Sequence, residues 1–169
     1  MNNQPASIFN KPKSKYINAY DINENIVKRN ADEFRFRLSV YGILIHKGKV
    51  LLQHNPIIDQ FGIPGGGVEI DEFMEDALKR EFYEETGLEV KVGKLISIKE
   101  NFFTHNGEDA HAIMVYFRVS TQAKGELERD NLTTEDSDYT KLVPLVKLDQ
   151  YNIVKIFRKF LDTTSISAY

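Results

Sequence analysis

The chain has no cysteine among its 169 residues. This absence excludes disulfides, thiolate metal ligands and a cysteine nucleophile, and it agrees with a reducing compartment. No apolar run approaches the roughly 20 residues that span a bilayer. The first fifteen residues also lack the apolar centre of a secretory signal. We therefore expect a cytoplasmic protein with no membrane partner.

The net charge of the chain is also small. Its net charge is −3 and its pI is near 5.8, so nucleic acid and basic membrane binding are not expected as functions. A small anionic substrate is compatible with this charge, because a bound metal ion can dominate the local field. The length suits one domain with a single sizeable core.

The first 30 residues are polar and lack apolar periodicity. We predict that residues 1–30 form a mobile tail or a loosely docked arm, and that residues 31–169 form the folded domain. An alternative is a specificity or dimer arm, because Tyr16, Ile17 and Tyr20 could dock against the domain or a second copy. A homodimer is thus left open.

Apolar periodicity predicts a layered domain after residue 34. Strands are expected at 35–45, 50–52, 88–103, 110–119 and 142–146, and helices at 72–86 and 149–161. We expect Asp71 to be the N-cap of the first helix and Gly87 to end it. The segment 61–67 is too rich in glycine and proline for a regular element. Together these predict an α/β or α+β fold with a mixed sheet between helices.

Three glutamates, Glu81, Glu84 and Glu85, share one face of the first predicted helix. Like charges at this spacing repel one another, which is unfavourable for bare carboxylates. The cluster becomes favourable around a hard cation such as Mg²⁺, which takes oxygen ligands and keeps waters that a phosphate can displace. Glu72, two turns earlier, can reach the same end of the helix.

A glycine-rich loop precedes this helix, and an arginine sits within it. Without Cβ atoms, residues 65–67 allow the backbone to approach a metal or phosphate closely. The loop leads toward a helix N-terminus, which favours phosphate. Arg80 is adjacent to Glu81 and can fix a carboxylate with a bidentate fork. We interpret the joint pattern as a metal and phosphate site.

This segment resembles the Nudix box, G-x5-E-x7-R-E-U-x-E-E-x-G-U, where U is an apolar residue. The matching positions are Gly66, Glu72, Arg80, Glu81, Phe82, Glu84, Glu85, Gly87 and Leu88. Phe82 is bulkier than the usual aliphatic residue. The preceding segment 64–69 is similar to the family's usual lead-in. The resemblance extends over about 35–161 and implies a Nudix-like α/β/α sandwich with a mixed β-sheet.

The resemblance also implies an activity and residue roles. The activity is Mg²⁺-dependent hydrolysis of a phosphoanhydride bond in a nucleoside diphosphate-linked substrate, and Mn²⁺ is the other hard ion expected to serve. The metal positions are Glu81, Glu84 and Glu85, completed by a backbone carbonyl at or near Gly66. Arg80 orients Glu81, and Glu72 is an auxiliary carboxylate. The attacking water is polarised by the metal and deprotonated by a carboxylate.

The general base differs between members of this family. Some use a glutamate of the box, here Glu81 or Glu84, and others use one in the loop before the last strand. The candidates in that loop are Glu135 and Asp136. The loop could equally be a solvated acidic segment.

Several residues outside the box are candidates for substrate binding. Arg35 and Arg37 alternate on a strand, as phosphate contacts would, or they form an exposed charged face. Phe103, with Phe102 beside it, could stack on a base or belong to the core. His105 and His111 flank a turn at Gly107, and we interpret them as structural before catalytic.

The substrate lies beyond what the box can predict. We expect a nucleoside triphosphate first, then a dinucleoside polyphosphate or a nucleotide sugar. ADP-ribose-type members carry a proline shortly after the box, and this chain has none between Gly87 and Leu142. The alternative is a catalytically silent Nudix-like binding or regulatory module. Such modules often lose box glutamates, whereas all of them are present here.

Overall fold

The computed structural model describes residues 15–105, 107–122, 127 and 139–161. The strands are β1 (Tyr16–Tyr20), β2 (Ile26–Asn30), β3 (Arg35–His46), β4 (Lys49–Asn55), β5 (Gln60–Gly62), β6 (Gly65–Gly67), β7 (Lys91–His105), β8 (Glu108–Ser120) and β9 (Tyr139–Pro144). The helices are α1 (Met74–Thr86) and α2 (Lys155–Leu161), with short 3₁₀ turns η1 (Ala31–Glu33) and η3 (Leu145–Gln150).

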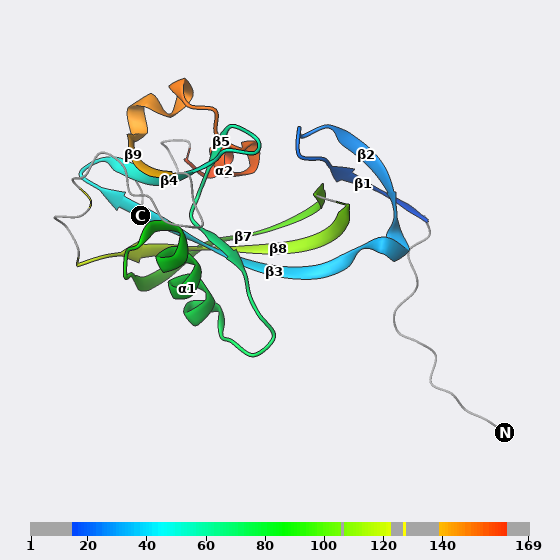
Figure 1. Ribbon diagram of the computed structural model, residues 1–169, viewed down its shortest axis with the longest axis horizontal. Helices are drawn as coiled ribbons and strands as arrows, with labels where there is room; N and C mark the ends of the chain where they lie inside the picture. The colour runs from blue at the N-terminus through cyan, green and yellow to red at the C-terminus, as the bar shows by residue number, and fades with distance from the viewer. Residues whose placement is uncertain (1–14, 106, 123–126, 128–138, 162–169) are drawn as a thin grey trace.

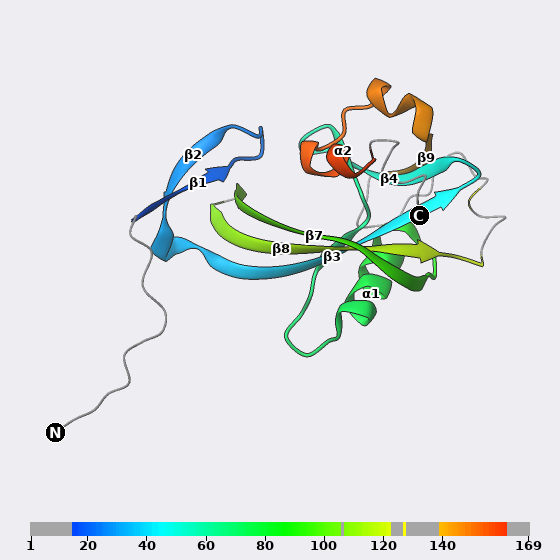
Figure 2. The same ribbon diagram turned by 180° about the vertical axis from the view of Figure 1, so that it is seen from behind.

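The strands form one mixed, curled sheet in the order β2-β1-β7-β8-β3-β4-β5, with β6 paired to β3 and β9 to β4. The pairs β3·β8 and β1·β7 are parallel, and the other pairs are antiparallel. Helix α1 lies on one face of the sheet and α2 on the other (Figure 1), as the reverse view in Figure 2 also shows. The predicted mixed sheet between helices is confirmed.

Two apolar clusters fill the two faces of the sheet. The cluster under α1 contains Ala77, Leu78 and Phe82 of the helix, packed against Val40 and Leu44 of β3 and their neighbours. The second lies under α2 and η3. The alternation of β3 explains the division, because Val40 and Leu44 face one cluster while Ile43 faces the other. The apolar side chains of α1 are therefore buried, except that Met74 is 40% exposed.

The predicted boundaries differ from the structure at three places. The first helix begins at Met74 after Phe73, so the N-cap prediction for Asp71 is wrong; no side chain caps this end. The helix does end as predicted: Gly87 has φ 70° and its N–H donates to the carbonyl of Tyr83. The glycine-rich segment, expected to be irregular, forms the three-residue strands β5 and β6. The last predicted helix is divided into η3 and α2.

The N-terminal segment contains a hairpin, not the irregular chain expected before residue 31. Strands β1 and β2 pair in register from Tyr16↔Asn30 to Tyr20↔Ile26, and β1 meets β7 at Tyr20↔Phe103. The turn is built by Asp21, whose carboxylate accepts two backbone N–H groups of the following residues. Such Asx chemistry stabilises a short polar hairpin with little apolar burial. The domain boundary near residue 30 stays a prediction.

Two ion pairs connect this hairpin to the rest of the protein. Arg29 of β2 lies 3.5 Å from the carboxylate of Asp109 on β8, and the Asp109 side chain is only 8% exposed. At the tip, Glu24 accepts the backbone N–H of Lys155, the first residue of α2, and pairs with its ammonium group, both at 2.8 Å. The hairpin therefore links the β7·β8 edge to the start of α2.

Candidate active site

The glycine-rich strand β6 is placed against the middle of β3. Gly65, Gly66 and Gly67 pair with Tyr41, Val40 and Ser39. Gly65 has φ 138°, and a Cβ atom there would lie 2.1 Å from the carbonyl oxygen of Val40. Only glycine fits this close backbone approach. The close approach seen at Gly65 is to the backbone of β3. The predicted approach of these glycines to a metal or phosphate stays a prediction.

The next glycine forms a cradle for a carboxylate of α1. A Cβ atom at Gly66 would lie 2.4 Å from both Cδ and Oε2 of Glu81. The carboxylate of Glu81 therefore rests directly on the backbone of Gly66, and any other residue would displace it. Two of the predicted metal positions, Gly66 and Glu81, are thus in direct contact.

Arg80 is the centre of the acidic cluster. Its Nε and Nη2 atoms donate to both oxygens of Glu72, at 3.2 and 2.6 Å. Its Nη1 atom donates to Glu81 at 3.0 Å and to Glu84 at 3.1 Å, and Nη2 also reaches the carbonyl of Gly67 at 3.1 Å. The bidentate fork thus holds Glu72 and not Glu81, the carboxylate expected from its adjacency to Arg80 in the sequence. Glu81 receives one hydrogen bond instead.

Glu72 in turn fixes the loop before α1. Its Oε1 atom accepts the backbone N–H of Glu69 at 2.9 Å as well as the Arg80 hydrogen bond. The Arg80 hydrogen bond, followed by the Glu69 amide, lowers the pKa of the Glu72 carboxyl below its usual range. A charged Glu72 between a helix guanidinium and a loop amide holds the loop against the helix.

Glu85 binds the residue that precedes the cradle. Its Oε2 atom accepts the backbone N–H of Gly65 at 2.7 Å. Burial raises the pKa of Glu85 to about 7, opposed by the Gly65 N–H and the Gln53 side chain, and reinforced by Glu81 and Glu84. A partly buried carboxylate near two others is the condition under which a cation is favoured.

The donor chemistry fits a hard divalent cation, although the side chains are not gathered around one. Among the described residues, no three His, Cys, Asp or Glu side chains lie grouped as metal ligands. Arg80 contacts Glu81 and Glu84 directly and offsets part of their negative charge. The Gly66 cradle, the raised pKa of Glu85 and the all-oxygen donor set together fit Mg²⁺ or Mn²⁺.

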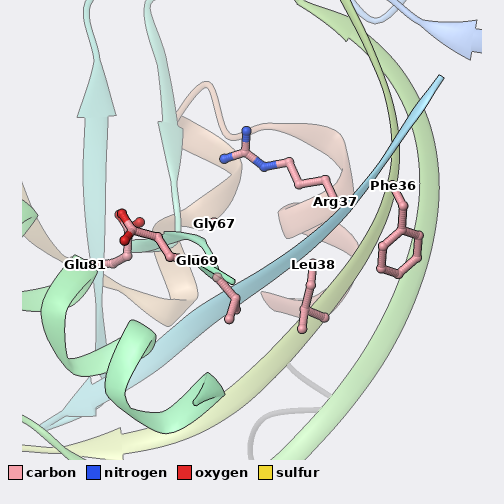
Figure 3. A pocket seen from close by; sticks show the side chains of 7 residues that line it. Phe36, Arg37, Leu38, Gly67, Glu69 and Glu81 are labelled. Atoms are coloured by element: carbon pink, nitrogen blue, oxygen red, sulfur yellow. The ribbon is translucent and has the colours of Figure 1, made fainter. Parts of the chain in front are cut away.

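An open pocket of about 340 Å³ adjoins this cluster (Figure 3). Its lining residues come from β3, from the glycine loop and from α1: Phe36, Arg37, Leu38, Gly67, Val68, Glu69 and Glu81. Arg37 is held by a hydrogen bond from its Nε to Ser39 Oγ at 3.2 Å, and its Nη2 lies within 3.2 Å of a Cβ built on Gly67. The Arg37 guanidinium therefore lies against Gly67 of the glycine-rich strand.

The remaining predicted residues are placed less directly. Arg35 is exposed on β3 and is not a pocket residue. Phe103 is partly buried against the core cluster under α2, so its stacking role stays a prediction. Glu135 and Asp136 lie outside the described residues, as does the side chain of His105. His111 stacks on Phe102 with ring centroids 4.2 Å apart and pairs with Glu100.

Sequence reasoning missed Phe36, Leu38 and Glu69 in the pocket. The alternation of Arg35 and Arg37 could have located Phe36 on the opposite face of the same strand, where a 69% exposed phenylalanine is unusual. Glu69 gave no signal, because its place depends on how the loop closes through Glu72.

Known proteins resemble this chain over most of its length. The model of the family described as NUDIX domain matches residues 35–163. The chain belongs to the Nudix family. It is 31% identical over 144 residues to an ADP-ribose pyrophosphatase of Methanocaldococcus jannaschii, covering 80% of this chain and 83% of that protein. The protein is accordingly a Nudix hydrolase of the pyrophosphohydrolase type.

The chain also resembles a longer curated protein in sequence and a solved structure in fold. The chain is 51% identical over 92 residues to diphosphoinositol polyphosphate phosphohydrolase 2 of Rattus norvegicus, covering 54% of this chain and 49% of that protein. It thus spans about half the length of that relative. A MutT protein structure from Methanosarcina mazei Go1 superposes with a TM-score of 0.61 at 23% identity, covering 80% and 97% of the two chains. This likeness shows the fold.

No helix within the described ranges is long and apolar enough to cross a membrane.

Proposed function

We propose that the protein hydrolyses a phosphoanhydride bond in a nucleoside diphosphate-linked substrate, with Mg²⁺ as the cation and Mn²⁺ able to replace it. The observation that supports this most is the Arg80-centred cluster of carboxylates on the Gly66 cradle. These like charges would repel one another without a cationic partner. Arg80 supplies that partner from one side, and a cation can supply it from the other.

Glu81, Glu84 and Glu85 are the residues that would hold the cation, together with the Gly66 carbonyl. When bound, the cation supplies positive charge at the phosphate oxygens and polarises the attacking water. Arg80 and Glu72 are positioning residues. The fork on Glu72 fixes the guanidinium, and the remaining Nη1 donor then holds Glu81 and Glu84 on the pocket side.

Arg37 is proposed to bind substrate phosphate at the pocket wall. Its Nε is occupied by Ser39, which fixes the plane of the guanidinium and leaves its far edge beside Gly67. A planar fork suits phosphate oxygens. Arg35, one full strand period away, is proposed as a second and more distant phosphate contact.

The general base is proposed to be a box glutamate or Glu135. Glu84 is the most exposed of the acidic residues held by Arg80, with 43% of its side chain accessible, so it can reach solvent water. Glu135→Gln distinguishes the two possibilities, because only a base in the loop would make that variant inactive. A fall in kcat with an unchanged KM is the expected signature.

The substrate range should be tested more widely than the sequence first suggested. The sequence favours nucleoside triphosphates first, and it disfavours ADP-ribose because the chain has no proline between Gly87 and Leu142. The relative from Methanocaldococcus jannaschii is named an ADP-ribose pyrophosphatase and matches most of the chain. We therefore include ADP-ribose as a second candidate substrate. Both candidates contain a nucleoside diphosphate.

The direct test is a substrate panel with product analysis. Nucleoside triphosphates, dinucleoside polyphosphates, nucleotide sugars, ADP-ribose and a diphosphoinositol phosphate are each incubated with Mg²⁺, Mn²⁺ or EDTA. We expect turnover of at least one nucleotide with either metal and none in EDTA. Nucleotide binding without turnover of any compound would favour the silent binding module instead.

A further inference from the structure

Two hydroxyl groups follow Arg37 on the same face of β3. Arg37, Ser39 and Tyr41 alternate along the strand, so their side chains lie on one side of the sheet. Figure 3 shows Arg37 leaving β3 on the opposite side from Phe36. Arg37 is exposed, Tyr41 is partly buried, and Ser39 is only 2% exposed. The row therefore leads from the pocket wall into the core.

The Tyr41 ring is held on two sides by aromatic neighbours. It stacks on Tyr116 of β8, its register partner, with ring centroids 5.2 Å apart and the planes at 21°. Phe157 of α2 meets it at 5.2 Å and 63°. The three rings pack together in the core cluster under α2. Since side chains in a close-packed core have little freedom to rotate, the Tyr41 hydroxyl is presented in a fixed direction.

Hydrogen bonds connect this ring to Arg37. The hydroxyl groups of Tyr41 and Ser39 are hydrogen-bonded to each other, and Ser39 Oγ accepts the Nε–H of Arg37 at 3.2 Å. Burial raises the pKa of the Tyr41 phenol, and the charge of Arg37 and the Ser39 hydrogen bond oppose that change. A buried hydroxyl costs free energy unless it is hydrogen-bonded. Each hydroxyl is satisfied by the next group in the row, which ends at a guanidinium on the pocket wall.

Tyr41 is also next to the strand that supports the carboxylate cluster. Its backbone pairs with Gly65 of β6, whose N–H donates to Glu85 at 2.7 Å. The negative charge of Glu85 reaches the Tyr41 phenol and adds to the rise of its pKa. The same tyrosine therefore lies beside the acidic cluster through its backbone and is linked to Arg37 through its side chain.

We propose that Tyr41 is a positioning residue for substrate binding, which acts through Ser39 to fix the Arg37 guanidinium in the orientation that binds a substrate phosphate. This rests on the proposed function, because it takes Arg37 to be a phosphate contact. An arginine side chain loses rotamer freedom when it binds a ligand. One that is already fixed at Nε loses less, and its two Nη groups remain directed at phosphate oxygens.

The first measurement follows the Arg37 Nε–H by NMR in the protein without substrate. Its signal is identified by its loss in Arg37→Lys. Ser39→Ala and Tyr41→Phe each remove one hydroxyl and keep the surrounding packing, so both should shift the signal and accelerate exchange of its proton with water. Tyr116→Phe is the matched control, because it removes the hydroxyl of the neighbouring ring, which donates to Met114 Sδ at 3.7 Å. It should leave the signal unchanged.

The second measurement is the Kd of α,β-methylene-ADP with Mg²⁺, determined by calorimetric titration. We expect Ser39→Ala and Tyr41→Phe each to weaken binding about three- to tenfold, the effect of losing one hydrogen bond. The KM of the best panel substrate should rise by a similar factor while kcat is unchanged, as for a contact made equally in the ground state and the transition state. In an Arg37→Met background, neither substitution should weaken binding further, because both act through the missing guanidinium.

Four results would overturn the positioning role: a wild-type Arg37 Nε–H signal in Tyr41→Phe, wild-type affinity of Tyr41→Phe for α,β-methylene-ADP, an undiminished effect of Tyr41→Phe in the Arg37→Met background, or no binding of the ligand to the wild type. The proposed function fails by a different observation, namely no metal-dependent turnover of any nucleotide by the wild type. Normal turnover with an unchanged KM in Tyr41→Phe refutes the positioning role alone.

Discussion

Arg80→Lys is predicted to loosen the acidic cluster while leaving its charge in place. Arg80 makes five hydrogen bonds, two to Glu72 and one each to Glu81, Glu84 and the Gly67 carbonyl. A lysine ammonium is a point charge on a flexible stem and cannot reproduce the fork. We expect it to keep about two of these contacts, as estimated from its three donors.

The loss can be estimated from the contacts that disappear. A hydrogen bond between charged groups contributes about 1.5–3 kcal/mol when buried. The Arg80 side chain is 30% exposed, so solvent screening reduces each contribution. We expect the free energy of unfolding of the metal-free protein to fall by about 2 kcal/mol. Because Glu81 and Glu84 are then held less firmly, kcat and kcat/KM should fall together by about 10–100-fold.

The assays are urea unfolding in EDTA and steady-state kinetics at saturating Mg²⁺. Lys79→Ala is the matched control, because Lys79 is the neighbouring cation on the same helix and its ammonium group lies 3.3 Å from Asp76. A change of a few tenths of a kcal/mol is expected for the loss of such a pair. Glu72→Gln should reproduce much of the stability loss of Arg80→Lys, with less than additive loss in the double variant. An unchanged kcat in Arg80→Lys would refute the positioning role.

Three other predictions concern the glycine cradle, Glu85 and the N-terminal hairpin. Gly65→Ala should lower the free energy of unfolding in urea by more than about 3 kcal/mol, because a φ of 138° and the nearby Val40 carbonyl leave no room for a Cβ atom. Gly66→Ala should displace only the flexible Glu81 carboxylate and keep most of the stability. Its turnover should fall about tenfold or more, because a ligand carboxylate that loses its support is misplaced. Burial raises the pKa of Glu85 in the folded protein to about 7, so its contribution to stability is complete below its unfolded pKa and is lost as pH rises through 7. Glu85→Gln should therefore raise the free energy of unfolding of the metal-free protein more at pH 8 than at pH 5. Equal changes in the free energy of unfolding at the two pH values would contradict this. Deleting residues 1–30 should leave one cooperative unfolding transition at lower stability, because the hairpin ion pairs to Asp109 and Lys155 are lost; a non-cooperative transition would show that the hairpin belongs to the core.

The sequence was most informative where local periodicity decides the structure. Ala77, Leu78 and Phe82 recur at helical spacing, which fixes the buried face of α1 and hence the common direction of Glu81, Glu84 and Glu85. The strand at Arg35 and the stop at Gly87 are likewise local features. The Nudix box combines these local patterns, so the fold class and the location of the acidic cluster could both be predicted.

Contacts set by loop closure could not be predicted from periodicity. The fork of Arg80 goes to Glu72 because the loop 68–73 folds back and brings Glu72 to the helix, whereas sequence adjacency favoured Glu81. The hairpin of β1 and β2 was missed because polar strands stabilised by an Asx turn and two ion pairs carry no apolar signal. Long-range partners of this kind become visible only in three dimensions.

We propose that the carboxylates on the pocket side of α1 form the metal centre of a phosphoanhydride hydrolase. The most direct measurement is Mg²⁺-dependent turnover of the best panel substrate by Glu84→Gln and Glu85→Gln, beside Glu75→Gln, an exposed glutamate in the first turn of the same helix. We predict that turnover falls by orders of magnitude in the first two variants, that it is unchanged in the third, and that all three unfold cooperatively. Full turnover in both Glu84→Gln and Glu85→Gln would contradict the assignment.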